Sequence, residues 1–224
     1  MAVVVLSGAI GAGKSSLTKY LADYLGAEPV YEQIDNPVLP LFYEDPYKYA
    51  YRLQLFFLNA RFHNIKKALK GGNYVLDRSI YEDPLLFKIN ADMGRASQVE
   101  IASYDATLDK MMNELQALPK SAPDLMVHLK ISYSTMIKWI KKRGREYEQI
   151  ENDSSLVDYY HRMLNYYDEW YENYNYSPKM IINGDDYDFV SNIEDRQEIL
   201  SQIAEKLSDD GSSFKVQEES KITL

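Results

Sequence analysis

Cysteine is absent from this chain of 224 residues, and its absence excludes thiol nucleophiles, thiolate zinc sites and disulfide scaffolds. No hydrophobic run approaches the roughly 20 residues that a membrane-spanning helix needs, and no basic segment with a cleavage site opens the chain. Acidic residues outnumber basic ones by 34 to 25, which argues against a protein that coats nucleic acid. We therefore expect a cytoplasmic protein that binds neither a membrane nor nucleic acid.

Hydrophobic residues make up 46% of the chain, enough to pack one core without disulfides or structural metal. No internal repeat and no linker composition divides the sequence, so residues 1–208 are predicted to form a single domain. Residues 209–224 are polar and lack periodicity, which predicts a flexible tail. The three histidines, His63, His128 and His161, do not have the spacing of metal ligands and are predicted to be structural.

Short β-branched runs alternate with segments of helical periodicity along the chain. The runs predict strands at residues 2–6, 29–33, 73–77, 124–130 and 180–182. Capping residues and i, i+3, i+4 spacing predict helices at 14–25, 45–69, 97–118, 154–174 and 194–207, with a further helix that ends at 142. This alternation predicts an α/β fold in which helices flank a parallel sheet of about five strands.

The stretch SGAIGAGKSS, residues 7–16, fits the phosphate-loop pattern G-x-x-x-x-G-K-[ST] and lies between a predicted strand and a predicted helix. Backbone N–H groups and the start of the helix attract phosphate oxygens, Lys14 can reach the β- and γ-phosphates, and Ser15 can bind Mg²⁺. The residues predicted to bind ATP are Gly8, Ala9, Ile10, Gly11, Ala12, Gly13, Lys14, Ser15 and Ser16.

Ligands of parallel sheets bind beyond the carboxyl ends of the strands, so the residues that follow each strand are candidates for the site. Glu32 stands at the end of the second predicted strand and can accept a proton from an attacking hydroxyl. Asp77 ends the third strand and is predicted to bind Mg²⁺ directly or through water; Arg78 next to it can place a positive charge at the reacting phosphoryl group. Residues 138–150 begin with a cluster of basic residues around Gly144 and are predicted to form an arginine-rich lid.

Several classes of nucleotide-binding protein compete for this pattern. A GTPase would carry an Asn-Lys-x-Asp motif, which the sequence lacks, and a motor ATPase usually has a longer chain. A nucleoside-monophosphate kinase needs arginines for the phosphate of its acceptor between the first and third strands, where Arg52 and Arg61 stand, both on the predicted long helix. Another small-molecule kinase of the same fold, or a non-catalytic NTP-binding regulatory protein, stays open as an alternative.

Five motifs, in this order and spacing, resemble the deoxyribonucleoside kinase family, and most closely its bacterial deoxyadenosine and deoxyguanosine kinases. They are the phosphate loop, the glutamate after the second strand, FYEDP followed by Gln and Arg, DRSIYEDP, and KKRGRxxE. The resemblance extends to about residue 207. It implies a P-loop kinase fold in which ATP, with Mg²⁺, phosphorylates the 5′-hydroxyl of a deoxyribonucleoside in nucleotide salvage.

The resemblance also implies a role for individual residues. Glu32 would be the general base, with Lys14 and Arg78 stabilising charge, and Asp77 and Ser15 would hold Mg²⁺. Substrate would be bound at Tyr43 and Glu148 (the sugar 3′-hydroxyl), Gln54 (the base edge), Arg61 and Asp83 (an ion pair over the base), and Phe57 and Phe87 (the base plane). Residues at the donor ATP would be Arg143 and Arg145 of the lid and, more loosely, Asp185, Tyr187 and Phe189.

The residues expected at the base of the nucleoside favour a purine. A glutamine offers a donor and an acceptor side by side, as the adenine edge requires, and the Arg61–Asp83 pair is typical of relatives that act on purines or cytosine. We therefore expect deoxyadenosine as the substrate, with deoxyguanosine next.

Two departures from the family pattern stand out. Asp77 replaces the glutamate of many relatives, and Trp139 replaces a lid arginine, whose charge Lys138 or Lys142 can supply. The resemblance further implies a homodimer, or a heterodimer with a related subunit, through the helix at 45–69 or that at 97–118. It also implies feedback inhibition by a deoxynucleoside triphosphate.

Overall fold

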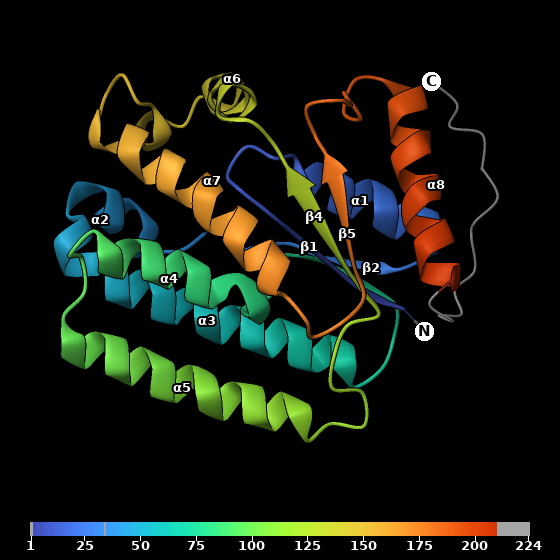
Figure 1. Ribbon diagram of the computed structural model, residues 1–224, viewed down its shortest axis with the longest axis horizontal. Helices are drawn as coiled ribbons and strands as arrows, with labels where there is room; N and C mark the ends of the chain where they lie inside the picture. Colours follow the sequence, from blue (N-terminus) through green and yellow to red (C-terminus); the bar gives the residue numbers. More distant parts are fainter. Residues whose placement is uncertain (1, 34, 210–224) are drawn as a thin grey trace.

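A sheet of five parallel strands forms the centre of the computed structural model, which describes residues 2–33 and 35–209 (Figure 1). The strands lie in the order β2-β3-β1-β4-β5, so the phosphate-loop strand is central. Their bounds are Val3–Gly8 (β1), Glu28–Val30 (β2), Tyr74–Asp77 (β3), Leu125–Lys130 (β4) and Lys179–Asn183 (β5). The predicted α/β class and the five-stranded parallel sheet are confirmed.

Eight α-helices and two short 3₁₀ turns surround the sheet in the described residues. The helices are α1 Lys14–Leu25, α2 Leu39–Glu44, α3 Pro46–Leu69, α4 Asp83–Asp92, α5 Gln98–Gln116, α6 Tyr133–Arg143, α7 Ser155–Asn173 and α8 Ile193–Asp209. The 3₁₀ turns are η1 Ile80–Glu82 and η2 Glu146–Glu148. Residues 210–224, predicted as a flexible tail, lie outside the described residues.

Capping groups set the ends of the helices that the sequence predicted. The Asp45 side chain accepts a hydrogen bond from the Lys48 N–H at 3.1 Å, and proline follows it at the first turn of α3. Ser97 and Glu100 form the capping box of α5. Gly26 ends α1 with φ of 57°, a left-handed conformation that glycine adopts without strain.

Three parts of the chain differ from the prediction. β2 ends at Val30, so Glu32 lies two residues beyond its strand and not at its end. Two helices, α2 and α4, were not predicted: α2 has only six residues, too few for a periodic pattern, and α4 begins at Asp83 directly after a 3₁₀ turn. Each has a proline in its first turn, where the missing N–H costs nothing.

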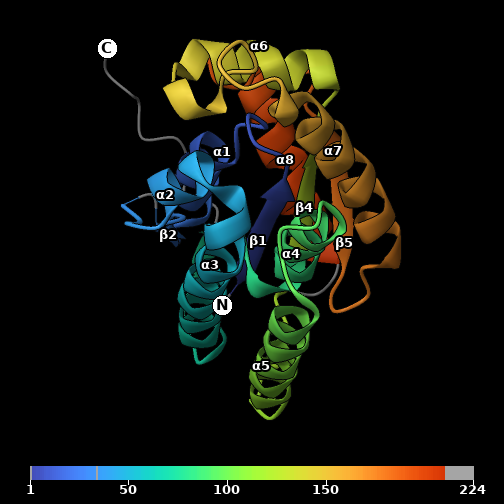
Figure 2. The same ribbon diagram turned by 90° about the vertical axis from the view of Figure 1, so that its left-hand side faces the viewer.

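The side chains of β1 alternate between the two faces of the sheet, and both faces are covered. Val4 and Leu6 share a core cluster with Leu17 and Leu21 of α1, whereas Val3 and Val5 lie in a second cluster with residues of α3 such as Leu58. Helices α1 and α8 pack together on one face, and α3, α4, α5 and α7 lie on the other (Figures 1 and 2). A strand buried on both sides explains the continuous apolar run in the sequence.

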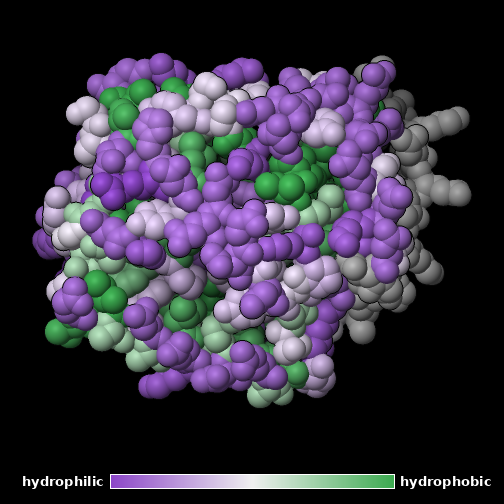
Figure 3. Space-filling view, viewed as in Figure 1, coloured by the Kyte–Doolittle hydropathy of each residue, from purple (hydrophilic) through white to green (hydrophobic). Residues whose placement is uncertain are grey.

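The face drawn in Figure 3 is largely hydrophilic, and its hydrophobic side chains form separate groups between charged ones. Among the described residues, no helix combines the length and hydrophobicity that a membrane crossing requires.

Candidate active site

A cavity of about 520 Å³ lies at the carboxyl ends of the strands. It is bounded by the β1–α1 loop, the segment after β2, helices α2 and α3, the segment after β3, the end of α6, and the β5–α8 loop. Figure 1 shows α6 above the tips of β4 and β5, where it covers this end of the sheet. A site at this place agrees with the rule for open parallel sheets.

The phosphate loop takes a conformation that requires glycine at two positions. Gly11 and Gly13 have φ of 82° and 86°, values that other residues rarely adopt. A Cβ atom at Gly13 would also lie 2.7 Å from Cζ of Phe189. Because Gly13 immediately precedes α1, the N–H groups of the first helical turn open toward the loop.

Lys14 lies folded over the same loop. Its Nζ donates to the carbonyl oxygens of Gly8 and Ala9, each at 2.9 Å. Burial, reinforced by the nearby Arg78, lowers the pKa of Lys14 to about 8, although carboxylates close by oppose the change. The side chain is therefore a buried cation at the place where a triphosphate binds to loops of this kind.

Ser15 and Asp77 meet because β1 and β3 are neighbours. Leu6 is paired in register with Asp77, which brings the end of β3 beside the loop that follows β1. The Ser15 hydroxyl donates to Oδ2 of Asp77 at 2.5 Å, and the buried Oδ1 of Asp77 has no hydrogen-bond partner. A hydroxyl and a carboxylate oxygen with free lone pairs are suitable ligands for Mg²⁺, so these residues fit the ion.

Five alternating charges form a row, and the middle three, Arg61, Glu32 and Arg78, line the cavity. Glu32 is at the centre of the row and forms ion pairs with Arg61 and with Arg78, whose Nε lies 3.2 Å from Oε2 of Glu32. Each arginine contacts a second carboxylate that is fully buried, Asp83 for Arg61 and Glu82 for Arg78. Burial opposes ionisation of Glu32, but the two guanidinium groups outweigh it and lower its pKa to about 2. Glu32 is thus a carboxylate at any physiological pH.

The pair of Arg61 and Asp83 lies deeper than Glu32. Burial raises the pKa of Asp83, and the Arg61 guanidinium opposes that rise. Oδ2 of Asp83 and Nε of Arg61 are buried without hydrogen-bond partners. Unpaired buried polar atoms are costly, so this end of the cavity is suited to a ligand with polar edges.

Gln54 and Phe57 form a slot next to this pair. Both line the cavity from α3; Gln54 is only 4% exposed, and its Oε1 has no hydrogen-bond partner. The Arg61 guanidinium carbon lies 4.8 Å from the centre of the Phe57 ring. Leu53, Leu86 and other apolar side chains complete the walls. An apolar slot with one amide on its edge can bind a flat heterocycle.

The opposite wall joins α2 to the lid segment. The Tyr43 ring packs on Tyr147 with centroids 4.5 Å apart, and burial raises the pKa of Tyr43 well above its usual value, so its hydroxyl remains a donor. Glu148 is 3% exposed and accepts hydrogen bonds from Arg143 at 2.5 Å and Arg145 at 3.3 Å. These contacts hold the lid arginines at the cavity, which both of them line.

Comparisons with known proteins agree with one another on the family of this chain. The family model described as deoxynucleoside kinase matches residues 4–208. The chain belongs to the deoxynucleoside kinase family. It is similar to a deoxyguanosine kinase of Lactobacillus acidophilus, 61% identical over 94% of this chain and 93% of that one. It is also similar to a deoxyadenosine kinase of the same organism, 51% identical over 94% of this chain and 98% of that one.

A solved structure shares the fold. A deoxyadenosine kinase from M. mycoides with bound dATP superposes with a TM-score of 0.72 at 25% identity, covering 90% of this chain and 99% of that one. The P-loop kinase fold expected from the motifs is therefore confirmed, as is the family.

Most of the site residues expected from the family motifs are brought together. Those that line the cavity are Ile10, Gly11, Ala12, Gly13, Lys14, Ser15, Ser16, Glu32, Tyr43, Gln54, Phe57, Arg61, Asp77, Arg78, Arg143, Arg145, Glu148, Tyr187 and Phe189. They come from segments that span 180 positions of the kinase sequence, from residue 10 to residue 189, and the sheet topology is what joins them.

Five expected residues do not line the cavity. Gly8 and Ala9 act through their carbonyl groups on Lys14, and Asp83 lies behind Arg61. Phe87 is 3% exposed and stacks on Tyr104 in the core, with ring centroids 4.2 Å apart, because α4 turns the preceding residue, Leu86, to the cavity instead. The Asp185 carboxylate accepts from the Ser132 N–H at 3.1 Å and thereby caps the region before α6.

Sequence reasoning missed part of the wall. Tyr159 and Met163 line the cavity from α7, four residues apart on one helix face, a spacing that looks like ordinary core packing. Trp139 and Lys142, which the sequence placed in the lid, line the cavity from α6, with Lys142 Nζ 4.6 Å from the indole centre. Of the histidines, His128 is buried with Nδ1 3.0 Å from the Ser7 hydroxyl, and in the described part of the kinase no three or more His, Cys, Asp or Glu side chains cluster as a metal site would require.

Proposed function

We propose that this kinase transfers the γ-phosphoryl group of ATP to the 5′-hydroxyl of a purine deoxyribonucleoside, with Mg²⁺, in nucleotide salvage. One arrangement carries the proposal: the phosphate loop and the Gln54–Phe57 slot line one cavity together with Glu32 and Arg78, which are ion-paired. The arginines of the cavity are already engaged with carboxylates. This favours a neutral acceptor over a nucleoside monophosphate.

Glu32 is the proposed general base. The 5′-hydroxyl would take a hydrogen-bonding place at Glu32 that a guanidinium N–H now holds, and pass its proton to the carboxylate as the new P–O bond forms. A hydroxyl becomes strongly acidic only as it is phosphorylated, so a carboxylate with a low pKa can still accept this proton. Arg78 and Lys14 offset the negative charge that develops on the transferred phosphoryl group.

Ser15 and Asp77 are the residues that would hold Mg²⁺. The ion, when bound with the triphosphate, neutralises charge on the phosphate oxygens. The lid at residues 138–150 would close over the donor, and Arg143 and Arg145 would exchange their contacts with Glu148 for phosphate oxygens. Glu148 and Tyr43 are then placed to accept and donate hydrogen bonds at the sugar 3′-hydroxyl.

Two purine bases are candidates, and different observations favour each. Considered by itself, the amide of Gln54 favours adenine, because it offers the donor and acceptor that the adenine edge requires. Guanine is favoured by the higher identity to relatives named deoxyguanosine kinase, 61% and 59% against 51% for one named deoxyadenosine kinase. The unpaired Arg61 Nε is a donor that guanine O6 or N7 can use. We propose deoxyguanosine first and deoxyadenosine second, which reverses the order expected from Gln54.

The family also guides proposals on assembly and regulation. We propose a dimer, of identical or related subunits, through α3 or α5. Only Tyr104 and Leu115 of α5 are buried within the described part of one subunit, so most of the surface of this helix is left for a second subunit. Feedback inhibition by a deoxynucleoside triphosphate is physically reasonable, because its base would fill the Gln54 slot while its phosphates reach the loop. Competition of dGTP and dATP with the nucleoside tests this idea. We also propose a cytoplasmic location, in keeping with a role in nucleotide salvage.

Steady-state kinetics with matched acceptors tests the base preference. We expect a higher kcat/KM for deoxyguanosine than for deoxyadenosine, and low values for thymidine. Gln54→Leu, which keeps the apolar contacts and removes the amide, should lower kcat/KM for both purines by about 10². Exposed Gln98 at the start of α5 serves as the control position, as Gln98→Leu. A Gln54→Leu enzyme with unchanged kcat/KM would exclude the amide from base recognition.

A further inference from the structure

Arg78 has a backbone conformation that a non-glycine residue rarely adopts. Its φ is 71°, and within the described residues it is the one non-glycine residue with positive φ. Such a conformation is strained and persists only where neighbouring contacts fix it. The backbone N–H of Arg78 donates to the Leu6 carbonyl at 3.0 Å, and side-chain contacts complete the restraint.

Two residues behind the cavity hold the guanidinium of Arg78. Its Nη1 lies 3.3 Å from Oε2 of Glu82 and donates to the Tyr167 hydroxyl at 2.5 Å. The Tyr167 hydroxyl in turn donates to the same Glu82 oxygen at 2.8 Å. The three groups form a closed triangle of hydrogen bonds, a geometry in which each contact restricts the other two.

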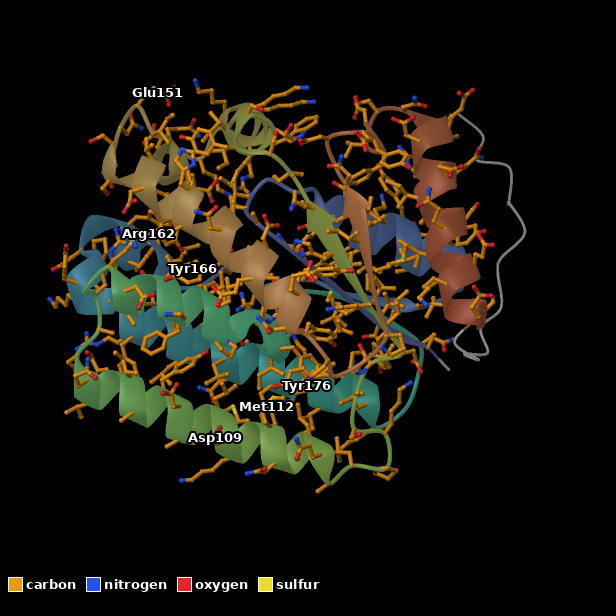
Figure 4. The ribbon with its side chains drawn as sticks, viewed as in Figure 1. Asp109, Met112, Glu151, Arg162, Tyr166 and Tyr176 are labelled. Atoms are coloured by element: carbon orange, nitrogen blue, oxygen red, sulfur yellow. The ribbon has the colours of Figure 1, made fainter. Side chains whose placement is uncertain are left out.

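Neither partner takes part in the cavity itself. Glu82 is fully buried, Tyr167 is 2% exposed, and neither of them lines the cavity, whereas Arg78 does. Burial raises the pKa of Tyr167 well above its usual value, so this hydroxyl keeps its proton and can donate. Figure 4 labels Tyr166 and Arg162 on α7; neither lines the cavity, and the Tyr166 hydroxyl donates to Asp92 of the neighbouring helix α4. This contact joins α7, the helix that carries Tyr167, to α4.

Arg78 needs a second carboxylate, in addition to Glu32, to keep its guanidinium in place during the reaction. Glu32 holds the Nε side of Arg78, and Glu82 holds the Nη1 side. When an acceptor hydroxyl engages Glu32, the contact between Glu32 and Arg78 weakens, and the guanidinium would follow the phosphate oxygens without a second anchor. Glu82 and Tyr167 supply that anchor from the protein interior.

We propose that Glu82 and Tyr167 are positioning residues for the phosphoryl-transfer step, which set the place and orientation of the Arg78 guanidinium without touching substrate. This inference rests on the proposed role of Arg78. A misplacement of about 1 Å can lower the turnover of an enzyme about 10²-fold, and the loss of an interaction made only in the transition state lowers kcat without changing KM. The effect is therefore expected in kcat and not in KM.

The test compares Tyr167→Phe, Glu82→Gln and Arg78→Ala with a control, Tyr174→Phe. Tyr174 is also buried, and its hydroxyl lies 2.8 Å from Ser177 Oγ, away from the cavity. Turnover is counted per folded site, with sites titrated by ADP binding. We expect kcat to fall about 10-fold in Tyr167→Phe and more in Glu82→Gln, with KM for nucleoside and ATP within about twofold. The control should keep its kcat.

A double variant separates positioning from a general loss of structure. In the Arg78→Ala background, Glu82→Gln should cause no further loss of kcat, because its effect acts through the missing guanidinium. The same double variant should have a higher Tm than Arg78→Ala alone, since it removes a buried carboxylate that has lost its cation. Should Glu82→Gln not fold, Tyr167→Phe alone carries the test.

The outcomes are distinct. Full kcat in both Tyr167→Phe and Glu82→Gln, with a large loss in Arg78→Ala, overturns this inference and keeps the proposed role of Arg78. Full kcat in Arg78→Ala overturns that role itself. An equal loss from Glu82→Gln with and without Arg78 also overturns the inference, because the residue would then act by another route.

Discussion

Glu32→Gln perturbs the centre of the row of charges and should affect both catalysis and stability. The amide keeps the shape of the side chain but cannot accept a proton, so turnover should fall by roughly 10²-fold or more. The folded structure should survive, because Arg61 and Arg78 each keep one carboxylate, Asp83 and Glu82. Buried arginines with no carboxylate at all would be far more costly.

The stability change follows from the pKa of Glu32. Interaction with the arginines lowers that pKa from 4.5 to about 2 in the folded protein. Since each tenfold change in proton affinity corresponds to about 1.4 kcal/mol, the native state gains on the order of 3 kcal/mol from this group at neutral pH. A depressed carboxyl pKa stabilises the fold fully above pH 4.5, and this contribution is lost as the pH falls toward 2.

Urea denaturation at several pH values measures this difference. At pH 7 the Glu32→Gln protein should be less stable than the parent by about 3 kcal/mol, and the difference should shrink as the pH is lowered from 4.5 toward 2. Glu114→Gln is a suitable control because Glu114 is half exposed and pairs with Lys66 at the surface; little change is expected there. A Glu32→Gln protein that is as stable as the parent at pH 7, or a difference independent of pH, would show that the ion pairs of Glu32 do not stabilise the fold.

Other predictions test the donor side. The affinity of the free enzyme for ATP should fall as the pH rises through about 8, where Lys14 loses its proton; a binding isotherm that is flat up to pH 10 contradicts this. Trp139 lines the cavity, so ATP should change its fluorescence, also in a Trp170→Phe protein that lacks the other tryptophan; no change in that variant would place the donor elsewhere. Gly13→Ala should abolish ATP binding measured by calorimetry, because φ is 86° and the new Cβ would meet Phe189. Retained affinity would show that the loop can relax.

Local signals predicted most of the scaffold. The Asp45 cap with its following proline and the Ser97–Glu100 box fix where α3 and α5 begin, and such signals act over a few residues. The phosphate loop likewise needs only its own glycines and the strand and helix beside it. These elements could be read from the sequence because their causes lie within one turn of the chain.

The row of charges could not be derived in the same way. Glu32, Arg61 and Arg78 come from three separate segments, and only the β2-β3-β1 order brings them together. Glu82 stands beside Asp83 in the sequence, but the turn from η1 into α4 directs the two carboxylates to different arginines. Phe87 shows the converse: its place in a motif suggested the base plane, whereas the rotation of α4 puts it in the core with Tyr104.

The most direct test of the proposed function identifies the product of purified enzyme with ATP and Mg²⁺. Deoxyguanosine, deoxyadenosine, deoxycytidine, thymidine and AMP serve as acceptors, ADP release gives the rate, and phosphorus NMR locates the new phosphate. We expect 5′-monophosphates of the purine deoxyribonucleosides, formed fastest from deoxyguanosine. Phosphorylation of AMP with no turnover of any deoxyribonucleoside would contradict it.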